Sequence, residues 1–429
     1  MKASPNTYRR HFLRSAAALA ASPVLTASAF RIDQGGALFN PCGELSAALR
    51  EHEFTQSAFA NLNWNDVWDS HTHLLGMGES GSGAWVSPEM MSPVNLRQYA
   101  QFRFYLNAAC VKHGRDNTDQ TFLARLLRLL GDFPTGCRAM VLAFDRTHAE
   151  TGAVQSDLSA FYLPNQYAAD VAAKHAARMQ WVASIHPYRA DAAEAVANAV
   201  AQGAVAVKWL PPAMGIDPAS KHCDAFYDAM AKFDVPLISH GGEEKAVHGA
   251  GKPEFGNVLK LRRPLERGVR VVVAHCASLG MDTDLDKGAN GPSVTCFSLF
   301  ERLMASKAYV GRLFGDVSAL PQSNRIDFLP RVVKHEDWAS RLVNGSDYPL
   351  PGVFPLFSVD AIVERGWLDA SVGAHIKQVR QGNPMLFDFL LKRHLRVDGQ
   401  SFSNATFESA RVFRRARVTA ERNPASLAL

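Results

Sequence analysis

The sequence lacks the features that mark several large classes of protein. None of its six cysteines belongs to a Cys-x-x-Cys pair, which excludes a zinc knuckle and a dense disulfide scaffold. It has no apolar run long enough for a span in the mature protein, and no internal repeat or low-complexity tract. With 47% hydrophobic and 20% charged residues among 429, the composition is that of one large or two ordinary globular domains.

The first 29 residues have the composition of an export signal. Arg9 and Arg10 begin the run "RRHFLR", and a weakly apolar, alanine-rich stretch follows it. Small residues at positions 27–29 suit a signal peptidase. The Arg-Arg-x-Phe-Leu-Arg pattern resembles the twin-arginine signal, which implies export of a folded protein to the periplasm. A disordered or membrane-anchoring amino terminus is the alternative interpretation.

Charge and cysteine content give two further expectations. The net charge is +5, and removal of residues 1–29 would leave 42 basic against 41 acidic residues, so the mature protein would be nearly neutral. A nearly neutral protein is not expected to bind nucleic acid, which calls for a basic face. Folding before export would take place in a reducing cytoplasm, so the fold cannot need disulfides and most cysteines should be buried free thiols.

Short β-rich segments recur along the chain, separated by helical or loop segments such as 119–132, 191–203 and 224–234. This repeat predicts a closed (β/α)8 TIM barrel, with a doubly wound sheet as the rival fold. No glycine-rich nucleotide turn follows the first strand, which disfavours the rival. The predicted strands cover residues 67–70, 139–144, 180–186, 204–210, 235–240, 269–275, 309–318 and 341–347.

These strands also predict the organisation of the chain. We expect an amino-terminal extension over residues 30–66, the barrel over 67–390, and a carboxy-terminal helix and tail over 391–429. The gap between the first two strands is too long for a plain loop. We therefore expect an insertion after the first strand that lies over the barrel mouth.

Ionisable residues occupy the carboxyl ends of five predicted strands, the end at which barrel active sites are built. Alternation along the strands places them on the interior face, together with Val271 and Val273 on the sixth strand. Such a buried group needs a counter-charge, and a divalent cation supplies one. The six residues are His71, His73, Lys208, His240, His275 and Asp347.

In order along the chain, these residues resemble the amidohydrolase superfamily of metal-dependent barrels. The segments "DSHTH", "AVKWLPP", "LISHGG", "VVAHCA" and "NGSDYP" are most similar to its amidohydrolase-related branch, over roughly residues 65–390. The resemblance implies one or two divalent ions, with zinc first and manganese or iron as alternatives. It also implies that His71, His73 and Asp347 bind one ion.

The resemblance assigns less certain roles to the remaining residues. His240 would bind the same ion or a second one. His275 would bind a second ion or orient the attacking water, and Asp347 would also accept a proton. Lys208 would bridge two ions as a carboxylated side chain, or hold an anionic group as an ammonium.

The expected activity is that of an exported metal-dependent hydrolase. It would cleave an ester, lactone or amide bond of a small molecule with a metal-activated water. A nonoxidative decarboxylase or other C–C lyase is the first alternative, and a non-catalytic binding protein on the same barrel is the second. The substrate and the oligomeric state, a homo-oligomer included, stay open.

Other polar residues near the strand ends have competing interpretations. His186 could reach substrate or be a hydrogen-bonded core histidine. Asp316 and Arg325 are candidates for holding substrate. Glu243 and Glu244 follow His240 directly and are expected in a solvated loop.

Overall fold

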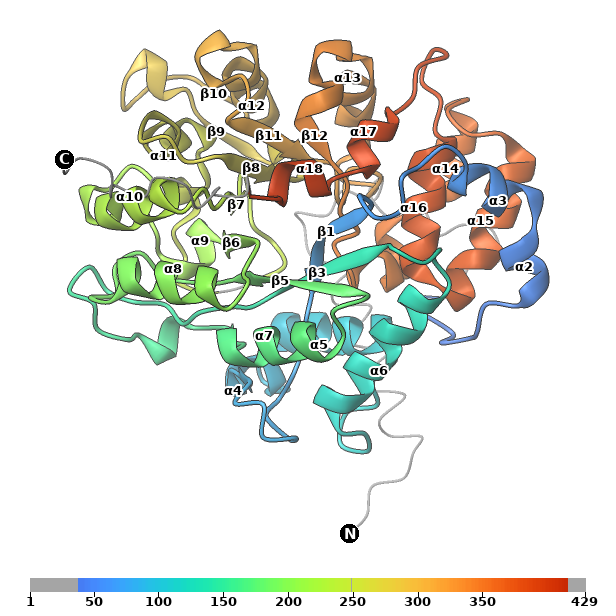
Figure 1. Ribbon diagram of the computed structural model, residues 1–429, viewed down its shortest axis with the longest axis horizontal. Helices are drawn as coiled ribbons and strands as arrows, with labels where there is room; N and C mark the ends of the chain where they lie inside the picture. The colour runs from blue at the N-terminus through green and yellow to red at the C-terminus, as the bar shows by residue number, and fades with distance from the viewer. Residues whose placement is uncertain (1–37, 248, 416–429) are drawn as a thin grey trace, which may run out of the picture.

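The computed structural model describes residues 38–247 and 249–415, so the predicted signal peptide at 1–29 lies outside the described residues. Eight parallel strands form one sheet in the order β1-β3-β5-β6-β7-β8-β11-β12, with helices around it (Figure 1). This is the predicted TIM barrel. Its strands are β1 (Trp68–His73), β3 (Arg138–Leu142), β5 (Met179–Ala183), β6 (Ala206–Trp209), β7 (Leu237–His240), β8 (Val271–Ala274), β11 (Leu313–Asp316) and β12 (Leu342–Val343).

The first and last strands meet through the segment that follows β12. The amide of Ser70 donates to the carbonyl of Asn344 at 2.9 Å, and the amide of Asp347 donates to the carbonyl of His71 at 2.8 Å. The amide of His73 donates to the carbonyl of Tyr348 at 2.9 Å. These bonds bring Asp347 against β1, at the carboxyl end of the strands.

Helices follow most strands and cover the outside of the sheet. The predicted helices at 119–132, 191–203 and 224–234 are found as α6, α8 and α10. The α-helices are α2 (Ala47–Glu51), α3 (Glu53–Phe59), α4 (Pro88–Met91), α5 (Leu96–Ala108), α6 (Thr118–Gly131), α7 (Asn165–Lys174), α8 (Ala192–Ala201), α9 (Pro211–Met214), α10 (Asp224–Lys232), α11 (Arg262–Glu266), α12 (Cys296–Ala305), α13 (Leu329–Lys334), α14 (Val359–Glu364), α15 (Ala370–Gly382), α16 (Pro384–His394), α17 (Asn404–Phe407) and α18 (Ala410–Phe413). In the described part of the chain, no helix is both long and apolar enough to cross a membrane.

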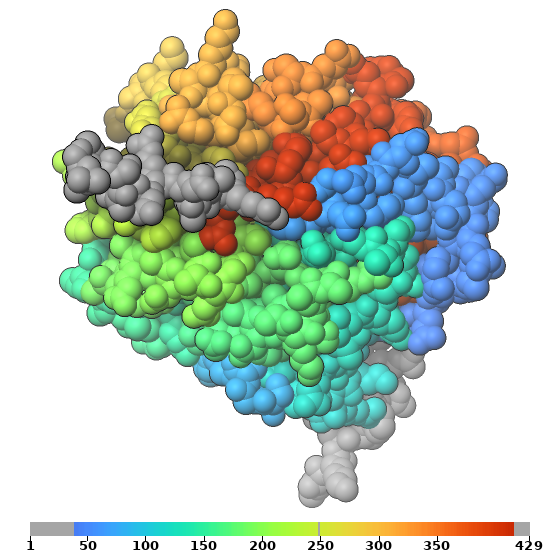
Figure 2. Space-filling view, in the orientation of Figure 1, coloured from blue at the N-terminus to red at the C-terminus, as the bar shows by residue number. Residues whose placement is uncertain are grey.

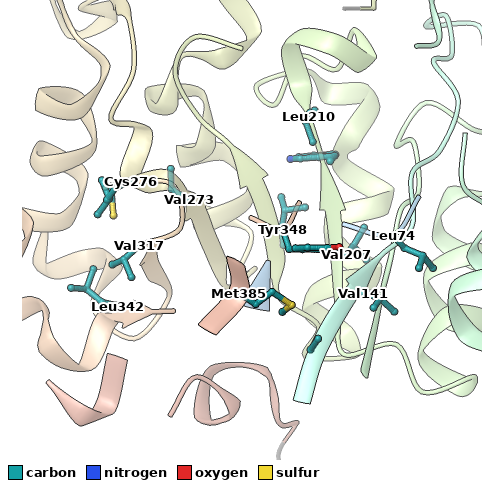
Figure 3. Close-up of a cluster of buried hydrophobic side chains, with 14 of the residues drawn as sticks. Leu74, Val141, Val207, Leu210, Val273, Cys276, Val317, Leu342, Tyr348 and Met385 are labelled. Atoms are coloured by element: carbon teal, nitrogen blue, oxygen red, sulfur yellow. The ribbon is translucent and has the colours of Figure 1, made fainter. Parts of the chain in front are cut away.

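Two hydrophobic layers follow from the alternation of side chains along the strands. An inner layer fills the barrel and includes Met140, Ile238 and Val272. An outer layer lies between the sheet and the helices, and Figure 3 shows some of its side chains. Val271 and Val273 belong to this outer layer, so the prediction that they face the interior is wrong by one residue. Val272 is the residue of β8 that points inward.

The amino end of the barrel is closed by the end of the described chain. Ala410, Val412 and Phe413 of α18 join the inner hydrophobic layer beside Trp68. The amide of Ala410 donates to the carbonyl of Asp66, just before β1, at 3.1 Å. The barrel is therefore plugged by apolar side chains at one end, which leaves the other end for chemistry.

Residues before and after the barrel pack together on its side. Figure 2 shows the segment of α2 and α3 beside the carboxy-terminal helices. The guanidinium of Arg393 on α16 donates to the carbonyls of Ala58 and Ala60, at 2.8 and 3.1 Å. A disulfide between Cys42 and Cys110 joins this amino-terminal segment to the end of α5. The other four cysteines are buried free thiols, as predicted for most of the six.

The long segment between β1 and β3 contains α4, α5 and α6. A short strand within it, β2 (Trp85–Val86), pairs with β4 (Phe161–Tyr162), and a second small sheet joins β9 (Met281–Thr283) to β10 (Ser293–Thr295). The hydroxyl of Tyr105 on α5 donates to the carbonyl of Ala246 at 3.0 Å. Because Ala246 lies in the loop after β7, this bond holds α5 against the carboxyl end of the barrel.

Candidate metal centre

A bulge in β1 directs its two histidines into the barrel. Trp68 lies in the inner layer, so simple alternation would turn His71 and His73 outward. The pairing of β1 with β3 shifts register between Asp69 and Thr72. The Asp69 carboxylate accepts the amide of His71 at 3.1 Å. The extra residue of a bulge reverses the alternation, and both imidazoles consequently face the other strand ends.

Three of the predicted ligands form a compact group. His73 Nε2 lies 3.1 Å from Asp347 Oδ1, and His71 Nε2 lies 3.5 Å from the same oxygen. Ligand atoms about 2 Å from a shared ion in tetrahedral geometry are about 3.3 Å apart. These separations therefore match a common ion. His71 and Asp347 are buried, whereas the His73 side chain is 25% exposed.

Close packing leaves no room for a side chain opposite His71. A Cβ added at Gly345 would lie 2.5 Å from the Cβ of His71 and 3.1 Å from Asp316 Oδ1. Any other residue at this position would displace the imidazole.

Asp316 fixes the orientation of the His71 ring. Its Oδ2 lies 2.7 Å from His71 Nδ1, and both side chains are 1% exposed. A carboxylate on Nδ1 holds the proton there and leaves the Nε2 lone pair for a metal. Asp316 therefore acts on a ligand histidine, which is a different role from the substrate contact considered for it.

His275 reaches the site through a left-handed turn. β8 ends at Ala274, and His275 has a φ of +55°. Its Nδ1 lies 2.8 Å from the hydroxyl of Ser318, and its Nε2 lies 3.8 Å from Asp347 Oδ2. The turn, and not the alternation of β8, directs this imidazole inward. Cys276, in the same turn, packs in the outer layer (Figure 3).

The hydroxyl of Ser318 links the outer nitrogens of two histidines. It lies 3.3 Å from His71 Nδ1, 2.8 Å from His275 Nδ1 and 2.5 Å from Asp316 Oδ2. His71, His275 and Asp316 are close enough to hold an ion on this side too. Because the hydroxyl already bonds all three, we interpret this cluster as a hydrogen-bond network that orients the ligands.

Lys208 lies beside His71 in the barrel interior. Its Nζ is 3.0 Å from His71 Nε2, and the residue is 2% exposed. Burial lowers the pKa of this amine to about 8, against the opposing charges of Asp347 and Asp316. The position suits both roles that the family resemblance implies for Lys208.

His240 is set apart from the compact group. Its ring centroid is 5.5 Å from that of His275, and its Nε2 donates to the carbonyl of Glu243 at 3.3 Å. Its Nδ1 lies 3.4 Å from the carboxylate of Glu244, whose side chain is 7% exposed. Glu244 is thus buried against a candidate ligand, and the expectation of a solvated loop is wrong for it. His240 stays a predicted ligand.

The electrostatics of the site favour neutral imidazoles around an ionised carboxylate. Burial lowers the pKa of His71, of His275 and, to about 4, of His240. Burial also acts to raise the pKa of Asp347, but His275, His71 and His73 outweigh it and hold that pKa below its ordinary value. Neutral imidazole and carboxylate are the forms that bind divalent cations.

The donor set therefore fits a divalent cation. Asp316 and Ser318 hold the Nδ1 atoms of His71 and His275, which directs both Nε2 atoms toward Asp347. His71, His73 and Asp347 would hold the ion. His275 lies within reach of the same carboxylate.

His186, a further candidate near a strand end, is not part of this centre. Its Nε2 donates to the carbonyl of Met214 at 2.9 Å, and its Nδ1 accepts the amide of Tyr188 at 3.3 Å. Both ring nitrogens are satisfied inside the protein, so the core interpretation fits it. Sequence reasoning missed the roles of Ser318 and Glu244. Ser318 is the last residue of the predicted strand at 309–318 and has no charge that marks it, and Glu244 was expected in a solvated loop.

A comparison with known proteins shows the family of this chain. The family model described as amidohydrolase matches residues 68–365, which is more than half of the chain. The protein belongs to the amidohydrolase family. Membership suggests a metal-dependent enzyme, and either hydrolysis or decarboxylation fits it. No curated protein matches the sequence.

Several solved structures are distantly similar to this amidohydrolase-family protein. A probable 2-pyrone-4,6-dicarboxylic acid hydrolase from Acinetobacter baumannii is 15% identical, with a TM-score of 0.40 over 70% of this chain and 90% of that one. A 5-carboxyvanillate decarboxylase from Novosphingobium aromaticivorans, solved with manganese, is 12% identical, with a TM-score of 0.42 over 74% and 92%. The IDCase of Metarhizium anisopliae is 13% identical, with a TM-score of 0.44 over 86% and 98%. Likenesses this distant do not decide the reaction.

Proposed function

We propose that this protein is an exported metal-dependent hydrolase that cleaves an ester, lactone or amide bond of a small molecule. The observation that carries the proposal is the group of His71, His73 and Asp347, with separations of 3.1 and 3.5 Å to one carboxylate oxygen. This group lies at the carboxyl end of a barrel, where enzymes of this fold hold their chemistry.

The chain's own residues provide the rest of the machinery. When bound, a divalent cation lowers the pKa of water and polarises the bond under attack. Asp347 Oδ2 faces His275 Nε2 at 3.8 Å, so both groups lie beside the same position and either can accept a proton from water there. Ser318 holds the His275 ring in place at 2.8 Å. Lys208 stabilises negative charge that develops beside His71.

We propose one ion as the resident state, with zinc first and manganese or iron as alternatives. The support is that the compact group has histidine and carboxylate donors only, which suit all three metals. His240 lies outside that group and would bind a second ion or complete the coordination of the first. Metal analysis of protein purified without chelators, with the number of ions per chain, tests this assignment.

Product analysis tests the reaction. Metal-loaded protein is assayed on ester, lactone and amide panels, and carbon dioxide release is measured from aromatic acids. We expect hydrolysis that is lost on chelation and restored by metal. Carbon dioxide release without hydrolysis would replace the hydrolase with a decarboxylase, and no turnover of either kind would favour a binding protein.

Export to the periplasm is supported by two separate features. Residues 9–14 have an Arg-Arg-x-Phe-Leu-Arg pattern that resembles a twin-arginine signal. Cys42 and Cys110 form a disulfide, a bond that persists in oxidising compartments. Both cysteines are only half-buried, so the bond can form after a folded protein has been exported. The fold would not need this disulfide before export.

Cell fractionation tests the localisation. The unaltered chain should be found in the periplasm with Cys42 and Cys110 oxidised, as measured by thiol labelling. An Arg9→Lys, Arg10→Lys double variant should stay in the cytoplasm with both thiols reduced. Periplasmic location of this variant would contradict the twin-arginine route.

A further inference from the structure

Arg325 is a buried cation beside the metal centre that the chemistry above does not use. It is 7% exposed and lies in the loop after β11. Its Nη1 donates to the hydroxyl of Ser278 at 3.3 Å, and its Nε has no hydrogen-bond partner in the described structure. Ser278 follows the turn of His275, so the guanidinium lies on the His275 side of the barrel mouth.

Two other buried arginines are held differently. Arg125 donates to two backbone carbonyls, at 3.1 and 2.8 Å. Arg341 also donates to two backbone carbonyls, at 3.1 and 2.7 Å. Each ties separate segments together, although each also leaves one nitrogen unpaired. Arg325 makes a single long bond from five N–H donors, which is too little to explain burial of its charge.

No carboxylate in the described ranges lies within 4.0 Å of the Arg325 guanidinium. The acidic groups that act on it from a greater distance are Asp347, Glu244 and Glu243. The positive charge of Arg325 in turn contributes to the lowered pKa of His240 and of His275. The guanidinium is therefore within electrostatic reach of the centre, with donors still available.

Charge at the mouth leaves room for an anion. The cations Lys208 and Arg325 face three buried carboxylates, those of Asp316, Asp347 and Glu244. The charge of Glu243 is paired with Lys245 at 3.1 Å. A divalent ion would add two positive charges and bring the total to one positive charge. A ligand with one negative charge would neutralise it, and a closed site would attract such a ligand.

The loop that carries Arg325 contains further unpaired polar atoms. Gln322 Nε2 and Ser323 Oγ are buried and have no hydrogen-bond partner in the part of the chain that the structure describes. Buried polar atoms usually find partners. Two N–H donors and one hydroxyl on a single loop suit an oxygen-rich acceptor.

We propose that Arg325 binds a carboxylate of the substrate, so that the hydrolysed ester, lactone or amide carries a free acid group. A guanidinium matches a carboxylate with two parallel N–H···O bonds, which gives both affinity and orientation. This inference rests on the proposed function, because it names the substrate class of the same site.

Calorimetric binding of simple acids tests the proposal. The probes are benzoate, isophthalate and succinate, with neutral benzamide and succinamide as matched compounds, titrated into metal-loaded full chain. We expect at least one acid to bind, and its amide to bind at least about tenfold more weakly. Arg325→Gln should weaken acid binding about tenfold or more and leave amide binding unchanged. The affinity of Arg325→Lys for the acids should lie between those of the unaltered protein and Arg325→Gln. Lysine keeps the positive charge but lacks the two parallel N–H donors of a guanidinium.

The control is Arg331→Gln, which changes an arginine on α13 whose side chain is 47% exposed. It should bind every probe as the unaltered protein does. Equal affinity of Arg325→Gln and the unaltered protein for the acids overturns the proposal. So does equal binding of acids and amides, or a lack of binding by any acid.

Thermal unfolding separates a binding role from a structural one. Arg325→Gln removes a buried charge that has no ion pair, so its Tm should be unchanged or raised. Arg341→Gln removes two bonds to backbone carbonyls and should lower the Tm. A lower Tm for both variants would show that Arg325 is structural.

Metal content of the same samples separates the two proposals. Arg325→Gln should hold as much metal as the unaltered protein. Absence of metal together with Arg325-dependent acid binding would overturn the proposed function alone. Metal-dependent hydrolysis with acid binding insensitive to Arg325 would overturn the substrate class alone.

Discussion

The two ends of the barrel use the same eight strands in opposite ways. At the amino end, Trp68 and Phe314 belong to one hydrophobic cluster with Val412 and Phe413 of α18. At the carboxyl end the interior side chains are polar, and the backbone departs from strand geometry. β1 has a bulge, and His275 and Asp347 have φ of +55° and +59°. Apolar packing stabilises one end, and backbone irregularity positions the ligands at the other.

The largest effect is expected from a substitution at the apolar end of the barrel. Phe413→Ala removes a ring that is 1% exposed, and the cavity left behind should cost about 3–5 kcal/mol of unfolding free energy. Denaturant unfolding measures this loss. Metal content per folded chain should not change, because the ligands lie at the other end. Val310→Ala, at a side chain that is 62% exposed, is the control and should have little effect.

A substitution at the polar end should lower activity, whereas the one at the apolar end lowers unfolding free energy. Asp347→Asn removes the carboxylate shared by His71 and His73, and activity should fall by about 10²–10³-fold or more. Steady-state assays on the substrate found in the panels measure the loss, with metal content recorded alongside. Asp337→Asn, at a side chain that is 70% exposed, should leave both unchanged. Full activity of Asp347→Asn would exclude the metal centre.

His186 tests whether every imidazole at the polar end is functional. Burial lowers its pKa to about 4, against the opposing effect of its bond to Met214. A histidine whose pKa is depressed on folding contributes stability that is present above the unfolded pKa of about 6.5 and is lost as pH falls through about 4. His186 should therefore cause a loss of about 3 kcal/mol of unfolding free energy when the pH falls from 7 to 4. His186→Gln should not show this part of the loss.

Unfolding measured across that pH range checks the contribution of His186. His222→Gln, at a side chain that is 57% exposed, should leave the pH dependence as it is. An unaltered slope in His186→Gln would show that this histidine does not cause the acid sensitivity.

The smallest expected effect concerns Asp316, which orients a candidate ligand histidine and is not itself a predicted ligand. Asp316→Asn keeps the shape beside His71 and removes the charge that holds its Nδ1 proton, so metal affinity should fall about 10–100-fold. Competition with a chelator measures the affinity. Asp327→Asn, at a side chain that is 83% exposed, should match the unaltered protein. Unchanged metal affinity in Asp316→Asn would show that the hydrogen bond is not needed.

Most of the fold was predictable because strand-forming segments and helices repeat along the chain. The predicted strands overlap all eight strands of the barrel. The interior face was predicted correctly for Ile238 and Val343, which lie on strands without an irregularity before them. It was wrong for Val271 and Val273, because the prediction counted back from His275 across a left-handed turn.

The meeting of His71, His73 and Asp347 was predictable for a chemical reason. Histidine, lysine and aspartate are costly to bury, so their presence at the ends of apolar strands indicates a shared function. The residues that orient these histidines were not predictable from the sequence. Ser318 is an uncharged residue at the end of a predicted strand, and Glu244 lies in an expected loop. The role of each depends on which histidine it meets in space.

The amino-acid order alone is enough to place eight strands, the polar residues at their ends and the insertion after the first strand, because periodicity and the cost of burial are local properties. The bulge in β1, the left-handed turn at His275, the burial of Glu244 and the pairing of Cys42 with Cys110 depend on neighbours distant in the chain. Such contacts are made when separate segments meet, so they emerge with the packed barrel.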